Sequence, residues 1–224
     1  MTVELRVLRT ADELAVMPKF EAGIWGGNDD RVSVNMLVAC IEEGGMAIGA
    51  FDGARMVGSV FGFRTYQTEV LHSHYMAVDP EYRRTGLGEQ LKRRQGDWCL
   101  ANGMTAVRWT FDPLRLANAH LNLNKLGAVG ITYHIDHYGA LGGINGALPS
   151  DRLTVQWDLA GESPQYDEQL VLAVPVASSE QIAASTAEAV HARMTLREAM
   201  APRVAAGWKV VAVDREFRTY TLGR

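Results

Sequence analysis

The sequence predicts an α/β (α+β) fold with a mixed, mostly antiparallel central sheet flanked by helices. Strand-like and helix-like segments alternate from residue 3 to 159 in the order β-α-α-β-β-β-α-β-α-β-β. The pair Asp52-Gly53 is a strong hairpin signal between two of these strands, so at least that pair is antiparallel. The 224 residues are 47% hydrophobic and 21% charged, which is typical of a soluble globular protein with a sizeable core.

Two helices are expected between the first and second strands. Val3–Leu8 alternates apolar and polar residues and therefore predicts a strand. Thr10 with Glu13 at the i+3 position forms a capping box, which predicts a helix that continues to Ile24. Ser33 is a suitable N-cap for the second helix.

The middle of the chain predicts a run of strands around one long helix. That helix extends from Gly88 to Ala101 and ends at Asn102-Gly103, where a left-handed residue is easily accommodated. The strands expected here are Met46–Phe51, Met56–Tyr66, Glu69–Val78 and Thr105–Phe111.

A further helix and two strands complete the predicted core. The helix is expected over Leu114–Leu126, and the strands over Val129–Tyr138 and Leu153–Leu159. Between these strands the glycine-rich segment Tyr138–Gly143 is either a lid or a plain surface loop, and the sequence leaves both readings open.

The last part of the chain is expected to be an α/β extension packed on the core. We predict a core domain over residues 1–160 and an extension over residues 161–224. The extension would contain a strand at Gln169–Val176, a long helix at Ser178–Ala206 with a break near Ala201-Pro202, and strands at Trp208–Val213 and Phe217–Leu222.

The composition gives no indication of a nucleic-acid or membrane partner. The net charge of −4 does not favour a nucleic acid or an anionic membrane. No apolar run reaches the ~18 residues of a membrane span, and the charged N-terminus is unlike a signal peptide, so the expected location is cytoplasmic. Cys40 and Cys99 are expected to be reduced, and no metal-ligand spacing surrounds them.

The segment Arg83–Gly88, Arg-Arg-Thr-Gly-Leu-Gly, is the strongest functional signal. It follows a strand that ends at Asp79-Pro80 and precedes the long helix. Its two glycines allow a tight turn with N–H groups facing outward at the positive end of the helix, where a phosphate is well held. Arg83 and Arg84 add cationic donors. A phosphorylated ligand is therefore expected here.

Three kinds of phosphate loop compete for this segment. A Walker loop requires Gly-Lys-Ser/Thr, which is not present. A dinucleotide fingerprint requires a third glycine where Leu91 stands, and Asp112 only partly matches its acidic position. The third pattern, Arg/Gln-x-x-Gly-x-Gly/Ala after a strand ending in Val-x-Pro, is matched by Arg83, Gly86 and Gly88.

This third pattern resembles the pyrophosphate loop of the GNAT superfamily of acyl-CoA N-acyltransferases. The resemblance covers residues 3–159 and is strongest from Leu71 to Gly127. The segments Trp-Thr-Phe-Asp-Pro-Leu-Arg from Trp109 and Leu-Pro-Ser-Asp-Arg-Leu from Leu148 are similar to one bacterial subfamily, some relatives of which acylate amino acids from succinyl-CoA.

The resemblance implies acetyl-CoA or another acyl-CoA as co-substrate. The strands at Leu71–Val78 and Thr105–Phe111 would splay, and backbone groups in the gap would bind the pantetheine arm like an added strand. The residues that the resemblance assigns to CoA are Met76, Ala77, Val78, Arg83, Arg84, Thr85, Gly86, Leu87, Gly88, Glu89 and Asn118.

The implied chemistry is attack of a neutral amine on a thioester, which needs a base for the ammonium proton. His72 falls where many GNAT enzymes carry a glutamate base, and His74 is expected on the same face of the strand, with Tyr75 on the opposite face. Leu123 stands where many GNAT enzymes carry the tyrosine that acts as the acid. Either Tyr133, Tyr138 or water takes that role, or the thiolate departs unassisted.

The acceptor is expected to be the amine of a small molecule. Its pocket would draw on Trp25, Asn28, Arg64, Trp109 and Arg115, and either Arg64 or Arg115 would suit a carboxylate.

Two alternative functions, neither of them catalytic, stay open. The first is a CoA-binding module, and the loss of the usual tyrosine supports it. The second is a regulatory or structural partner on the same fold, supported by the long extension, which could instead form a homodimer interface.

Overall fold

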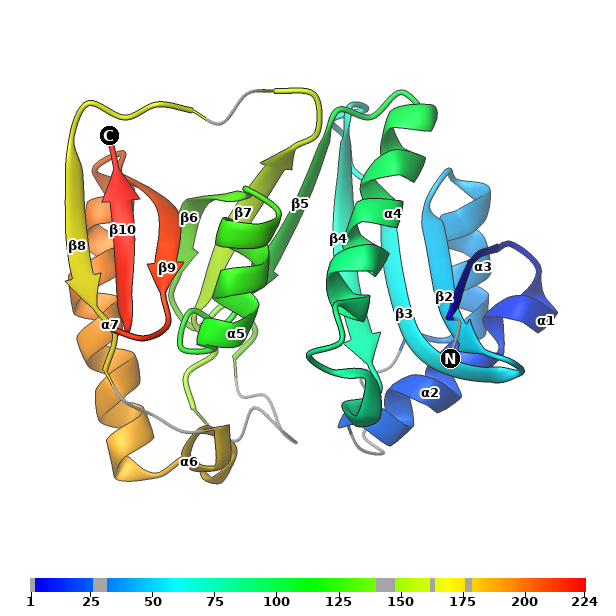
Figure 1. Ribbon diagram of the computed structural model, residues 1–224, viewed down its shortest axis with the longest axis horizontal. Helices are drawn as coiled ribbons and strands as arrows, with labels where there is room; N and C mark the ends of the chain where they lie inside the picture. The colour runs from blue at the N-terminus through cyan, green and yellow to red at the C-terminus, as the bar shows by residue number, and fades with distance from the viewer. Residues whose placement is uncertain (1–2, 26–31, 140–147, 162–163, 176–178) are drawn as a thin grey trace. The chain divides into compact units, whose positions relative to one another are not determined.

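The structure, a computed structural model, describes residues 3–25, 32–139, 148–161, 164–175 and 179–224 (Figure 1). The chain forms two compact units, Met1–Arg108 and Trp109–Arg224. The predicted fold class, a mostly antiparallel sheet flanked by helices, is confirmed.

The first unit is a sheet in the order β1-β2-β3-β4-β5, antiparallel from β1 to β4 and parallel between β4 and β5. The hairpin expected at Asp52-Gly53 joins β2 to β3, with Asp52 opposite Arg55. The elements are β1 (Glu4–Leu8), α1 (Ala11–Leu14), α2 (Val16–Trp25), α3 (Val34–Glu42), β2 (Met46–Asp52), β3 (Arg55–Arg64), β4 (Val70–Val78), a 3₁₀ turn η1 (Pro80–Tyr82), α4 (Leu87–Ala101) and β5 (Ala106–Phe111), whose end crosses into the second unit.

Both predicted helix caps are confirmed. The Glu13 amide donates to the Thr10 hydroxyl at 3.3 Å, and the Thr10 amide donates back to the Glu13 carboxylate at 3.0 Å. The Met36 amide donates to the Ser33 hydroxyl at 3.3 Å. The prediction of a single helix after Thr10 was wrong, because two helices, α1 and α2, form there and are separated at Ala15.

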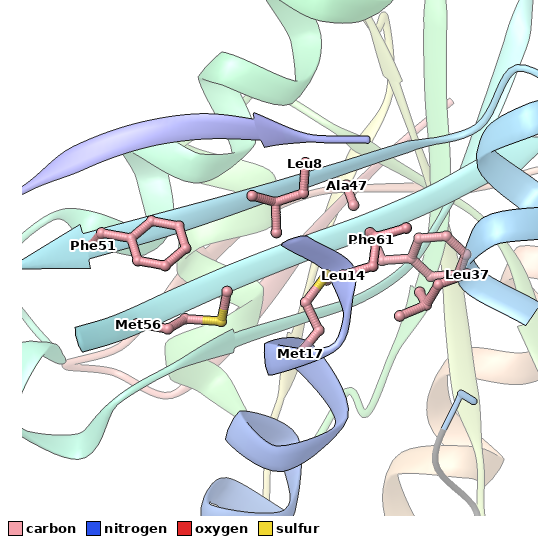
Figure 2. Packing of buried hydrophobic residues seen from close by; sticks show 8 residues of the cluster. All are labelled: Leu8, Leu14, Met17, Leu37, Ala47, Phe51, Met56 and Phe61. Carbon is pink, nitrogen blue, oxygen red and sulfur yellow. The ribbon is translucent and has the colours of Figure 1, made fainter. Parts of the chain in front are cut away.

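The helices of the first unit lie on opposite faces of its sheet. Phe61 of β3 packs in an apolar cluster with Leu14, Met17 and Leu37 from α1, α2 and α3 (Figure 2). Gly58, on the alternate face of the same strand, lies against Leu91 of α4. The sheet is therefore buried on both faces, and the loop before α4 is anchored by a packed helix.

Lys92 of α4 is buried, with 3% of its surface exposed, and its Nζ donates to Ser73 Oγ at 3.0 Å and to Gln95 Oε1 at 2.7 Å. Burial lowers the pKa of this amine to about 7, from an ordinary value of 10.5. Between these two values the unfolded chain binds more protons than the folded chain, so stability rises with pH. Below the lower value the buried charge is present in full and opposes folding.

We expect the free energy of unfolding to gain about 1 kcal/mol per pH unit from this group between pH 7.5 and 8.5. Chemical denaturation across that range measures the slope. Lys92→Met should flatten it, whereas Lys125→Met, which removes a lysine of the second unit that is not buried, should leave it unchanged. An equal slope in the Lys92 variant would contradict the assignment.

The strands of the second unit follow the order β7-β6-β9-β10-β8, and the pairs β6·β7, β6·β9, β9·β10 and β10·β8 are antiparallel. Its elements are α5 (Leu116–Ala119), a π-helix η2 (His120–Lys125), β6 (Val129–His134), β7 (Arg152–Asp158), β8 (Gln169–Ala173), α6 (Ser179–Ala184), α7 (Ala187–Ala205), β9 (Lys209–Asp214) and β10 (Thr219–Gly223).

Several boundaries in this unit correct the sequence predictions. The helix expected over Leu114–Leu126 is a short α-helix continued by a π-helix, and β6 ends at His134 instead of Tyr138. The long C-terminal helix breaks at Ser185, which is left-handed (φ +52°), and Pro202 lies within α7. The Thr186 hydroxyl then caps α7 by accepting from Ala189, which explains why the break falls there.

Residues of the predicted extension join the sheet of this unit, because Val210 of β9 pairs with Gly130 of β6. The domain boundary at residue 160 stays a prediction. Of the glycine-rich segment Tyr138–Gly143, only Tyr138 and Gly139 lie within the described residues. None of the helices in the described ranges combines the length and apolar character needed to cross a membrane.

Candidate functional site

The loop between β4 and α4 turns at Arg84 and Gly86. Arg84 has a φ of +67° and Gly86 a φ of +90°, so two left-handed residues alternate with right-handed or extended ones. Such an alternation directs successive N–H groups into a concavity that binds anions. The turn was predicted at Gly86 and Gly88, but Gly88 lies inside the first turn of α4, and Arg84 is the other left-handed residue beside Gly86.

The N-terminus of α4 presents its amides at the same place. The first helical bond runs from the Gln90 amide to the Gly86 carbonyl at 3.0 Å, so the amides of Leu87, Gly88 and Glu89 precede the helical ladder. Gly86 is the N-cap and has no side chain to accept from them. These amides and the helix dipole favour an anionic ligand.

The loop is held in place by polar contacts with the β2–β3 hairpin. The Tyr82 hydroxyl donates to the Asp52 carboxylate at 2.5 Å, and Arg55 pairs with Asp79 at 2.7 Å and with Glu81 at 3.0 Å. The Thr85 hydroxyl donates to the Tyr82 carbonyl at 2.7 Å. The turn at Arg84 and Gly86 and the free amides at the start of α4 together form the anion cradle. These contacts preorganise the cradle, which reduces the entropy lost on binding.

Charged side chains surround the cradle. Arg83 and Arg84 are exposed beside it, and Arg83 Nε donates to the Val78 carbonyl at 3.3 Å. Glu89, the acidic residue of the first helical turn, pairs with Arg93 at 2.9 Å, which offsets its repulsion of an anion. The net charge of these side chains is positive.

One edge of β4 directs alternate backbone groups away from β3. The Asp79 amide donates to the Val57 carbonyl at 2.9 Å, so the antiparallel alternation turns the polar groups of Ala77 toward β3 and those of Met76 and Val78 to the other edge. In the described part of the chain, the register of β4 with β5 ends at His72 opposite Arg108. Met76 and Val78 thus lie beyond the last residue of β4 that pairs with β5 in this part of the chain.

A β-bulge sits at His74. The register runs from Phe61 opposite Tyr75 directly to Gly62 opposite Ser73, so His74 is the extra residue of β4. Bulges twist a strand and redirect side chains, and they are common next to active sites. The bulge was not predicted from the sequence, because it depends on the pairing of β4 with β3.

The bulge brings His72, His74 and Tyr75 to one aromatic group. Phe63 lies 4.9 Å from the His72 ring and 5.8 Å from the His74 ring, and Phe61 lies 6.0 Å from His74 and 5.8 Å from Tyr75. The shared face predicted for the two histidines therefore agrees with these contacts. The expectation that Tyr75 points to the opposite face was wrong, because the extra residue shifts the alternation by one.

His74 is suited to accept a proton. Its side chain is still exposed, while packing by its aromatic neighbours partly desolvates the ring and lowers its pKa below the usual 6.5. The imidazole is then neutral at pH 7, which is the form that can act as a base.

Glu21 of α2 is a buried carboxylate that the sequence analysis did not single out. It has 2% of its surface exposed and lies against Tyr75, whose pKa is raised by burial first and then by the Glu21 charge. Met17 and Glu21, at i and i+4, are the buried residues of α2. The sequence signal for Glu21 was its position on the apolar face of the predicted helix, where a charged residue is unusual.

Asn118 and Tyr133 belong to the second unit. Asn118 is exposed on α5. The Tyr133 hydroxyl donates to the Asp151 carboxylate at 2.7 Å, and burial, followed by this hydrogen bond, raises its pKa. A phenol bound in this way is a weaker acid, so Tyr133 as proton donor stays a prediction with less support than the CoA loop.

The residues predicted to bind the acceptor are divided between the units. In the first, the Trp25 ring packs edge-on against Tyr75 at 5.7 Å, and exposed Arg64 reaches the Thr68 carbonyl at 3.5 Å. In the second, Trp109 is buried and Arg115 lies 3.9 Å from Asp112. Asn28 lies outside the described residues.

The fold of the chain is similar to that of several solved structures. The chain is similar to the ribosomal-protein-S18-alanine N-acetyltransferase from Escherichia coli (TM-score 0.57, 18% identity, 74% of this chain and 100% of that chain). It is also similar to yncA from Salmonella typhimurium, a structure that contains its cofactor acetyl-CoA (TM-score 0.56, 17% identity, 73% and 98%). A third is the IAA acetyltransferase from Bacillus cereus ATCC 14579 (TM-score 0.52, 14% identity, 70% and 99%).

These three structures are acetyltransferases, and their likeness to the chain is a likeness of fold. The family model of the acetyltransferase (GNAT) family matches residues 17–127, and the chain belongs to the GNAT superfamily. This family implies acyl transfer from CoA to an amine. No curated protein matches the sequence.

Proposed function

We propose that this protein transfers an acetyl or other short acyl group from coenzyme A to the amine of a small molecule. The observation that supports this most directly is the cradle at Arg84 and Gly86, followed by the amides at the start of α4. These donors match the pyrophosphate of CoA. The residues proposed to hold it are Arg83, Arg84, Thr85, Gly86, Leu87, Gly88 and Glu89.

The edge of β4 supplies the second part of the proposed CoA site. Backbone groups of Met76 and Val78 face away from β3 and would pair with the amides of the pantetheine arm as a β-strand does. The Val78 amide would then be the donor for the oxyanion that forms when the amine attacks the thioester. Asn118 is proposed to contact the same arm.

The histidines of β4 are the proposed bases. An aliphatic amine is mostly protonated at pH 7, so its proton must be removed before or during attack. His72 and His74 lie on one face beside Phe63, and His74 is predominantly neutral at that pH. The thiolate leaves with a proton from water or from Tyr133.

His72→Ala is expected to lower the turnover number by about 10²-fold or more, because a general base contributes at least that much. Thiol release from acetyl-CoA, measured with a panel of amines, gives the rate. His191→Ala, a change at an exposed histidine of α7, is the matched control and should have full activity. An unchanged rate for the His72 variant removes it from the mechanism and leaves His74 as the base to test.

The acyl chain and the acceptor are tested together by a mass-shift screen of acyl-CoAs against amines. Saturable CoA binding with turnover of at least one pair supports the proposal. Saturable binding without turnover of any pair would favour a CoA-binding module. If no CoA species binds, both functions are excluded and the fold assignment alone stands.

A further inference from the structure

The strand β8 (Gln169–Ala173) forms one end of the strand order, and in the described part of the chain β10 is its paired neighbour (Figure 1). The register between the two strands contains no bulge. The Glu168 amide donates to the Arg224 carbonyl at 3.1 Å, and the Val174 amide donates to the Arg218 carbonyl at 2.7 Å. The even-numbered residues here therefore direct their backbone polar groups toward β10.

The other edge of β8 presents backbone groups that β10 does not bind. Because antiparallel pairing alternates, Gln169, Val171 and Ala173 direct their N–H and C=O groups away from β10. The side chains of the same three residues are exposed, and 64% of the surface of Val171 is accessible. Such an edge is a template on which another extended strand can pair.

β8 lacks the features that normally prevent pairing at an edge. Its five residues, Gln-Leu-Val-Leu-Ala, include no charge and no proline. The edge strand of the first unit, β1, differs, because Glu4 and Arg6 are exposed on it and lie 3.8 Å apart. Charged side chains oppose pairing with another chain, so β1 is protected and β8 is not.

We infer that β8 pairs with β8 of a second copy of this chain, antiparallel and about a two-fold axis at Val171. In this register the two Val171 residues lie opposite each other, and Gln169 of one copy lies opposite Ala173 of the other. Each of these pairs can exchange two hydrogen bonds, because all of these residues direct their backbone groups to the open edge. Both copies use the same surface, so the assembly closes at a dimer.

The side chains of β8 add apolar contacts across this axis. Leu170 and Leu172 share the face on which α7 packs against the strand, where Leu172 is buried and Leu170 is partly exposed. The register places Leu170 of one copy opposite Leu172 of the other. Pairing would therefore cover Leu170 on one face and Val171 on the opposite face.

Charges at the two ends of β8 favour a second copy over an unrelated strand. Asp167 is exposed before the strand, and after it Arg218 Nη2 donates to the Pro175 carbonyl at 2.9 Å. The two-fold register places Asp167 of one copy opposite Pro175 of the other, beside Arg218, and symmetry repeats this contact. Glu168 already pairs with Arg224 at 2.6 Å. Pro175 has no N–H to donate, so the pairing ends there.

Analytical ultracentrifugation of the full-length protein tests the interface. Wild-type protein should show a concentration-dependent equilibrium between 24.6 kDa and twice that mass. We expect a dissociation constant of about 10 µM, because one strand pair buries little area. Val171→Lys should weaken the dimer about tenfold or more, since two lysines would meet at the axis. Ile135→Lys, the matched change at a 57% exposed residue just after β6, should leave the equilibrium unaltered.

Exchange of charge at the strand ends tests the two-fold register. Asp167→Lys and Arg218→Glu should each weaken the dimer about tenfold, because like charges then meet at both contacts. An equimolar mixture of the two variants should dimerise as the wild type does, since each contact then joins opposite charges. Circular dichroism reports the fold of each variant. Asp167→Lys, a change at an exposed residue before the strand, supplies the test if Arg218→Glu proves unstable.

A wild-type mass of 24.6 kDa at every concentration overturns the inference. A dimer that neither Val171→Lys nor Asp167→Lys weakens overturns it as well, because the two copies then meet at another surface. A mixture of folded charge variants that fails to dimerise overturns the two-fold register. The affinity for CoA, measured on the same variants, does not depend on this strand, so the dimer and the proposed function are tested separately.

Discussion

Replacing Gly86 by glutamate is expected to weaken CoA binding by about 10³-fold or more while the protein stays folded. The new carboxylate would lie at the start of α4, where the amides and the dipole favour an anionic ligand, and would repel a pyrophosphate. Loss of two or three charge-assisted hydrogen bonds accounts for an effect of this size. Calorimetric titration with CoA measures it, and circular dichroism reports the fold.

Backbone strain must be separated from charge in this experiment. Gly86 has a φ of +90°, so any side chain there is strained, although the nearest atom to an added Cβ is 3.9 Å away. Gly103, at the other end of α4, has a φ of +75° and open space around it. Gly103→Ala should cost a similar ~1–2 kcal/mol of stability with no change in CoA affinity. Unaltered affinity in Gly86→Glu would exclude this loop from the site.

Arg193→Met is expected to destabilise the protein by about 3–5 kcal/mol, the second large effect. Arg193 is 1% exposed and holds the buried Asp112 by two hydrogen bonds, at 2.7 and 2.8 Å. Removing the cation leaves a carboxylate buried without its main partner. Urea denaturation monitored by tryptophan fluorescence measures the change in the free energy of unfolding.

An exposed ion pair provides the control. Arg224 pairs with Glu168 at 2.6 Å, but both side chains are more than half exposed, so Arg224→Met should cost less than about 1 kcal/mol. Adding Asp112→Asn to Arg193→Met should restore part of the lost stability, because the unpaired charge is then removed. Similar losses in the two arginine variants would mean that burial does not set the strength of the Arg193 pair.

The anion loop could be found from sequence because its determinants are local. A strand, a short loop with Gly86 and a helix start occupy consecutive residues, and helix N-termini bind anions wherever they occur. The capping box at Thr10 and the Asp52-Gly53 turn were predictable for the same reason. The order of strands and helices, and from it the α/β class, followed from hydrophobic periodicity, which reports the burial of each face.

The features that escaped prediction depend on contacts between distant residues. The bulge at His74 exists only in the pairing of β4 with β3, and it decides that Tyr75 shares a face with the histidines. Glu21 and Lys92 look like ordinary surface charges in helices until the packing of α2 and α4 buries them.

The order of residues along the chain was sufficient to predict the fold class and the position of the loop between β4 and α4, because short-range patterns encode turns, caps and buried faces. Packing in three dimensions decided which charges are buried and which partners they contact. Arg193 and Arg197 show the physical reason, because α7 brings them to Asp112 and Asp151 from far along the chain. Local patterns cannot report a charge balance that only folding assembles.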